Sequence, residues 1–169
     1  MKPSAWQMLA MYLAIFVATL VQMNLAYAIR IGRAQPDFIV LMIVLTSMFC
    51  DANQGAALGF WGGLLTASMA APPHSGFGGL IVSRTLLGFG IGWLEERIFR
   101  DNPLLVVMLV AVGTAFAEGL FFLFAPQHNV ARWARVSLLL PILYNTVLAL
   151  PFYLLVRHFM AAHRDDAGG

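Results

Sequence analysis

The sequence predicts an all-α integral membrane protein, folded as a compact bundle of six transmembrane helices. The chain of 169 residues is 60% hydrophobic and only 11% charged, whereas a soluble domain carries about 25% charged residues. So few ionic groups cannot cover a surface that faces water. The arrangement of the apolar residues supports the same class, because they form six stretches separated by short polar breaks.

The predicted helices follow these stretches in order: 5–28, 36–50, 55–71, 77–94, 103–125 and 133–158. Four of them are long enough to cross about 30 Å of hydrocarbon. The second and third are shorter than the typical length of about 20 residues. The alternative is therefore five segments, in which these two together form a re-entrant hairpin. In either case, backbone at membrane depth must satisfy its own hydrogen bonds, which favours helices.

Polar and proline-rich breaks predict where the helices begin and end. Pro36 and Asp37 open the second helix, because proline needs no N–H donor in the first turn, and "DANQ" at 51–54 ends it. The N-terminal stretch resembles a cleavable signal peptide, but its charged region is thin, which favours a retained helix. We expect one polytopic domain over residues 1–160 and a short polar, disordered cytoplasmic tail over 161–169.

Glycines recur four residues apart in the third and fourth predicted helices. They are Gly55, Gly59 and Gly63 in "GAALGFWGG", and Gly88 and Gly92 in "GFGIG". Residues at this spacing share one helix face, and in lipid such a face lets a second helix approach closely. We therefore expect these two helices to pack on each other. The alternative of a phosphate-binding loop fails, because no strand precedes these glycines.

Arg84 extends the line of Gly88 and Gly92 by one turn, so it should point into the protein. An arginine near mid-membrane costs about 2.5–3.5 kcal/mol, so it needs a partner. Glu118 in the fifth helix lies at a matching depth if the fourth and fifth helices run antiparallel. We expect an Arg84–Glu118 ion pair or water-bridged contact, and a markedly lower folded yield for Glu118→Ala. Gln22, Asn24 and Asn145 are further intramembrane polar groups, either bonding across helices or lining a solute path.

Other functional classes have little support in the sequence. No basic stripe interleaved with aromatic residues indicates nucleic-acid binding, and no Cys/His spacing indicates a metal site. His74 and Ser75 could suggest a base and a nucleophile, but they lie in a Pro/Gly turn without an orienting acid. Cys50, the single cysteine, is expected to be a buried hydrophobe. The sequence therefore predicts neither an enzyme nor a cofactor.

Several stretches together resemble the MreD family of bacterial rod shape-determining membrane proteins. They are "QPDFIVLMIVL" with Pro36 and Asp37, "GAALGFWGGLL", "LLGFGIGWLEERIFRDNPLL", and "LLLPILYNTVLALPFYLLVR" with Pro141, Tyr144, Asn145 and Pro151. The resemblance covers residues 35–157, and its specificity comes from the order and spacing of the motifs. One departure is Ala67, where many members of the family carry an acid; no role of that acid can be transferred.

The resemblance implies a small polytopic protein of the bacterial inner membrane, with both termini cytoplasmic and no enzymatic activity. Its implied partners are the membrane protein MreC, a glycosyltransferase and a penicillin-binding transpeptidase of the rod complex, together with membrane lipid. The family in turn resembles the substrate-binding subunits of vitamin transporters in its six-helix arrangement. Charge alone does not fix the orientation, because basic residues are almost evenly divided between the two sides.

Two functional hypotheses follow. The first is a membrane scaffold, with residues 38–45, the glycine faces and the loop at 72–78 as candidate partner contacts. The second is a small-solute transporter subunit, in which Arg84 and Glu118 would face a ligand in a water-accessible pocket instead of facing each other.

Overall fold

The structure, a computed structural model, describes residues 3–24, 35–69, 76–95, 102–124, 130 and 134–165. All regular structure in these residues is helical, which confirms the all-α prediction for this part of the chain. The helices are α1 (Ala5–Asn24), α2 (Phe38–Ser47), α3 (Ala52–Met69), α4 (Phe77–Glu95), α5 (Pro103–Phe124), the π-helix η1 (Ala134–Leu139) and α7 (Leu140–Asp165).

Four helices in the described ranges are long and apolar enough to cross a membrane. These spans are Ala5–Asn24, Phe77–Leu94, Pro103–Phe124 and Leu140–His158. With 18 residues, α3 has the length, but its four glycines together with Asn53 and Gln54 make it less apolar. The structure thus supports a helical bundle with four candidate spans; the predicted count of six spanning helices is not established.

The second helix differs most from its prediction. It contains 10 residues, which corresponds to about 15 Å of helix, half of the hydrocarbon thickness of about 30 Å. All of its side chains are buried, and it contacts α1, α3, α4, α5 and α7. A helix that is hydrophobic all round belongs in a protein core. The prediction that residues 38–45 contact a partner is therefore wrong, because the other helices cover them.

Side-chain caps explain where α2 and α3 begin. Asp37 is the N-cap of α2, and its Oδ1 accepts from the Val40 backbone N–H at 2.9 Å. Asp51 and Gln54 bond reciprocally to each other's backbone N–H, at 2.9 and 3.3 Å, which is the capping-box arrangement. The segment "DANQ", interpreted from sequence as the end of the second helix, instead starts α3 three residues before Gly55. Pro36 lies just outside α2 rather than within its first turn.

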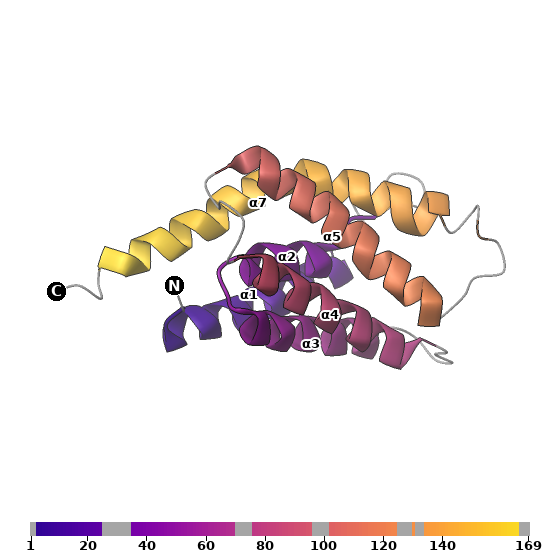
Figure 1. Cartoon of the computed structure of the whole chain (residues 1–169), viewed down its shortest axis with the longest axis horizontal. Coiled ribbons are helices and arrows are strands. Elements are labelled where there is room, and N and C mark those ends of the chain that lie inside the picture. Colours follow the sequence, from indigo (N-terminus) through magenta and orange to yellow (C-terminus); the bar gives the residue numbers. More distant parts are fainter. Residues whose placement is uncertain are drawn as a thin grey trace.

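The helices pack around α2. In Figure 1, α5 and α7 lie along one side of the molecule, α3 and α4 lie along the opposite side, and α2 lies between the two pairs. The fully buried core includes Ile39, Leu41, Ile43 and Leu45 of α2, and Ile15 of α1. This arrangement places the N-terminus of α2, and therefore Asp37, inside the bundle.

The glycines bring α3 and α4 into backbone contact. A Cβ added to Gly55 would collide with the carbonyl oxygen of Gly88, and one added to Gly88 would collide with that of Gly55. A Cβ at Gly59 would collide with the carbonyl oxygen of Arg84. Gly63 and Gly92 are similarly crowded, with Cβ positions 2.8 Å from Ile81 Cα and 2.6 Å from the Asp51 carbonyl oxygen. The glycine faces of α3 and α4 thus pack against each other inside the bundle and are not available to a partner.

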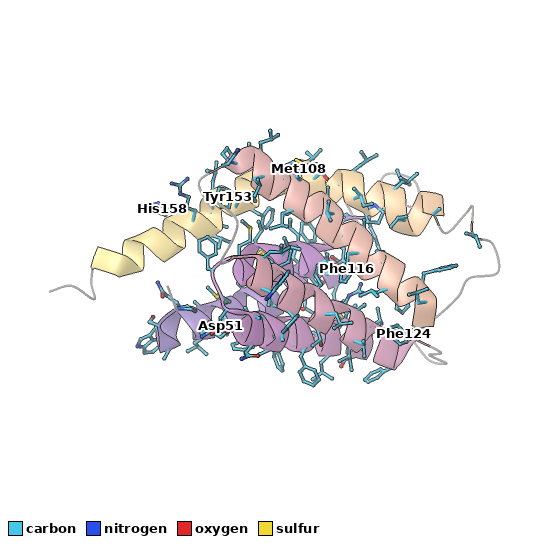
Figure 2. All side chains as sticks on the ribbon, in the orientation of Figure 1. Asp51, Met108, Phe116, Phe124, Tyr153 and His158 are labelled. Atoms are coloured by element: carbon cyan, nitrogen blue, oxygen red, sulfur yellow. The ribbon has the colours of Figure 1, made fainter. Side chains whose placement is uncertain are left out.

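Large apolar side chains cover the outside of the bundle. On α5 the exposed residues follow a four-residue spacing through Leu104, Met108, Val112 and Phe116. Figure 2 shows Met108, Phe116 and Phe124 spread along α5. Further exposed leucines, valines and aromatics lie on α1, α4 and α7. An apolar surface of this kind marks a membrane-facing or interaction surface.

The C-terminal helix begins and ends later than predicted, and it bends in its middle (Figure 1). Pro151 lies inside α7, and proline is a common cause of such kinks because it cannot donate to the carbonyl four residues earlier. The helix ends at Asp165. The first five residues of the expected disordered tail are therefore helical, and residues 166–169 lie outside the described part of the chain.

Candidate functional site

Arg84 is the centre of a buried charged cluster. Its side chain is only 3% exposed, and its Nη2 lies 3.0 Å from Glu118 Oε1 and 3.3 Å from Asp37 Oδ2. Its Nη1 donates to Ser83 Oγ at 3.0 Å, and the guanidinium carbon lies 5.9 Å from the centre of the Phe121 ring. The structure thus brings together Arg84 and Glu118, and it adds Asp37 as a second carboxylate partner.

Asp37 has three separate interactions. One carboxylate oxygen caps α2, the other accepts from Arg84, and its backbone N–H donates to Asn145 Oδ1 at 3.1 Å. The N-terminal end of α2 also presents the positive end of its dipole to this carboxylate. In the sequence, Asp37 stands out only as a motif residue at a helix start. An acidic N-cap residue before a short apolar run is visible in the sequence, but this pattern does not reveal how deeply the cap lies inside the helical bundle.

The charges in the cluster do not balance when all groups are ionised. One guanidinium faces two carboxylates, which gives a formal charge of −1 among groups that are mostly buried. An unbalanced charge is costly to bury, so the single guanidinium is essential to both carboxyl groups. The Nε of Arg84 is also buried, and no hydrogen-bond acceptor for it lies among the described residues. A small polar molecule beside Nε could therefore accept a hydrogen bond from it.

A neutral hydrogen-bond network surrounds the charged cluster. Asn145, fully buried on α7, donates through Nδ2 to Thr114 Oγ1 of α5 at 3.1 Å. Gln22 of α1 donates to the Pro36 carbonyl oxygen and accepts from the Phe38 N–H, both at 2.9 Å. The side chains of α1, α4, α5 and α7 thus all converge on the N-terminal end of α2. Of the two roles considered from sequence, bonding across helices describes Gln22 and Asn145, whereas Asn24 bonds to Leu20 of its own helix.

Replacing Gln22 with leucine tests this network. The change leaves the Pro36 carbonyl and the Phe38 N–H without their side-chain partner, and an unpaired buried polar group costs about 1–3 kcal/mol. We expect a measurably lower unfolding temperature for purified Gln22→Leu in detergent. Asn24→Leu is the matched control, since Asn24 is exposed and its described hydrogen bond, to the Leu20 carbonyl oxygen, lies within α1. Equal melting temperatures for the two variants would contradict the assigned role of Gln22.

The remaining motif residues are spread along α7. Pro141 and Tyr144 are half-buried near its start, directly after η1, and Pro151 is exposed. Of the four motif residues in this segment, Asn145 is the one with a described bond to the N-terminal end of α2. Ala67 is buried in α3. His74 and Ser75 lie outside the described residues, as do positions 72 and 73 of the loop proposed as a partner contact.

Within the part of the chain that the structure describes, no group of three or more His, Cys, Asp and Glu side chains could hold a metal ion. Comparison with protein-family models, with curated proteins and with solved structures found no match to this chain. The class of protein that the fold and the site define is thus a helical bundle with four candidate membrane spans and a buried Arg84–Asp37–Glu118 cluster.

Proposed function

We propose that this chain is a non-enzymatic membrane scaffold of the bacterial elongation (rod) complex. In this role it resides in the inner membrane with both termini in the cytoplasm. It binds MreC and helps to position the glycosyltransferase and the transpeptidase of lateral peptidoglycan synthesis, and so maintains cell shape. The mechanism is positional: the bundle stabilises one arrangement of its partners through contacts that differ between arrangements.

One observation supports this proposal most. Asp37 and Asn145, two residues that carry the resemblance to the MreD family, are 108 positions apart and joined by a hydrogen bond at 3.1 Å. Asp37 also completes the cluster in which Arg84 is held by the protein's own carboxylates. This arrangement suits a rigid scaffold, because two carboxylates of the same chain already pair with the Arg84 guanidinium and no ligand is needed as its counter-ion.

The exposed apolar faces suggest where a partner would bind. The core helix α2 and the glycine faces are buried, so the contact surface must be sought on the outside of the bundle. The stripe on α5, from Leu104 to Phe116, has the spacing expected of a helix face that packs against lipid or another helix.

Co-purification with MreC tests the scaffold proposal. The full chain is expressed with MreC from the same genome, extracted in mild detergent, and captured through a tag on one partner. We expect both chains to elute together in size-exclusion chromatography, and the signal to weaken when Val112 and Phe116 are replaced together by alanine. A well-folded chain that elutes without MreC would contradict the proposal.

The alternative is a membrane subunit of a small-solute (vitamin-type) transporter. The buried Nε of Arg84, for which the described part of the chain offers no acceptor, is the observation that favours it, because a polar solute could accept this bond. A solute that co-purifies with the wild-type chain but not with Arg84→Lys, together with no association with MreC, would support the transporter role instead.

A further inference from the structure

Three sulfur atoms converge where α1 packs against the connection between α2 and α3. The Cys50 Sγ lies 3.6 Å from the Met11 Sδ and 3.9 Å from the Met8 Sδ. Met11 and Cys50 are 3% and 1% exposed, and Met8 is half-buried. The charged cluster around Arg84 uses none of these residues.

Local structure holds the three sulfurs in place. Met8 and Met11 are three residues apart on α1, so they lie on one face of that helix. Cys50 lies in the bend after α2, where its N–H donates to the Ser47 carbonyl oxygen at 3.1 Å. Beside them, Tyr12 packs edge-on against Trp61 with ring centres 6.4 Å apart, which fixes α1 against α3.

We propose that Cys50, Met8 and Met11 form a binding site for a soft monovalent metal cation, Cu(I) or Ag(I). Thiolate and thioether sulfurs are the ligands that select Cu(I) over harder cations. A zinc–thiolate bond is about 2.3 Å long, and three sulfurs placed in a plane around one metal at about this distance lie about 4 Å apart. The two distances from Cys50 are close to this value, so a metal could enter with small side-chain movements.

The charge of the bound state selects a monovalent cation. On binding, a bond forms between the metal and the Cys50 sulfur while the S–H bond breaks, and the proton leaves to water. No oxidation state changes in this step. The thiolate carries −1 and the cation +1, so the occupied site is neutral, which avoids the high cost of burying a net charge. A divalent ion with the same ligands would leave a net +1.

The position of Met8 provides a route of entry. It is the fourth residue of α1, so it lies within the first turns of the helix, and its side chain is half-buried whereas the other two ligands are buried. A metal arriving from the end of the bundle would meet the Met8 thioether first and then pass to Met11 and Cys50.

Silver binding to the purified full-length chain tests this site. Ag(I) is offered in the presence of excess free cysteine, so that a thiol acting alone cannot retain the metal, and bound silver is measured after dialysis. We expect one Ag(I) per wild-type chain, none for Cys50→Ser, and weakening for Met11→Leu by at least the roughly tenfold that loss of a supporting group costs at metal sites. Leucine and methionine have similar volumes, so the packing is kept.

Met108→Leu is the matched control, because Met108 is 58% exposed on α5, on the outside of the bundle (Figure 2). We expect it to bind silver like the wild type. Size-exclusion profiles establish that every variant is folded before the titration. Absence of silver from folded wild-type protein would overturn the proposal. Undiminished binding by a Met8→Leu/Met11→Leu double variant would do so as well.

Discussion

Replacing Arg84 with leucine is expected to cause the largest loss of stability of any single change outside the glycine interface. The variant removes the one cation in the described cluster and leaves Asp37 and Glu118 facing each other. Removing one partner of a buried ion pair costs about 3–5 kcal/mol, because the remaining charge is uncompensated. We expect little monodisperse protein in size-exclusion chromatography after detergent extraction, and a strongly lowered melting temperature for what remains.

Glu118→Gln is the control for this prediction. The amide oxygen can still accept from Arg84, and the change removes the surplus negative charge, so the expected loss is below about 1 kcal/mol. Glu118→Ala should be intermediate, because Asp37 still partners Arg84; this revises the sequence-based expectation of a marked loss. The double variant Arg84→Leu/Glu118→Gln should recover part of the yield. An Arg84→Leu chain as stable as the wild type would show that the pairing contributes nothing to the fold.

Replacing Gly59 with leucine is expected to separate α3 from α4. Even a Cβ at this position would collide with the backbone carbonyl of Arg84, and backbone cannot move aside as a flexible side chain can. Overpacking typically costs about 1–3 kcal/mol, occasionally more. We expect the upper end of this range, which lowers the melting temperature by on the order of 10 °C in a chain of this size. The displaced backbone also carries Arg84, so the charged cluster should loosen.

Gly90→Leu provides the matched comparison on α4. A Cβ at Gly90 meets nothing within 4 Å, so the same chemical change falls where there is room for it. Melting curves and size-exclusion profiles of the two variants, measured in the same detergent, separate the effect of the contact from that of losing a glycine. Similar behaviour of Gly59→Leu and Gly90→Leu would contradict the close approach of the two helices at Gly59.

Local regularities explain which parts of the fold and site were predictable. The composition indicates a membrane protein because a deficit of charge is visible in any order of residues. The spacing of Gly55, Gly59 and Gly63 reports a helix face because a helix repeats every 3.6 residues. The pairing of Arg84 with Glu118 could be anticipated because Arg84 lies about as far from the start of its helix as Glu118 lies from the end of its own. In antiparallel helices the two side chains therefore lie at a similar depth.

The second carboxylate partner of Arg84, Asp37, could not be predicted from the sequence in the same way. Asp37 begins an apolar run, and an apolar run reads equally as a spanning helix or as a short buried one. Only when α2 proves to be 10 residues long does its first turn fall inside the bundle, where Asp37 meets Arg84. The cap formed by Asp51 and Gln54 was likewise visible as "DANQ", but the same letters suit the end of one helix and the start of the next.

The sequence by itself determined that this chain is helical, apolar on its outside, and built around glycine-lined contacts, because these properties depend on composition and on spacing within one helix. The tertiary structure alone decided that α2 is a buried central helix, that Asp37 shares Arg84 with Glu118, and that Gln22 and Asn145 close the network around them. The physical reason is that the depth of a side chain in the bundle, and the groups that it bonds to, depend on how far each helix extends and on what surrounds it. Both are set by contacts between residues far apart in the sequence, such as Asp37 and Asn145, which are 108 positions apart.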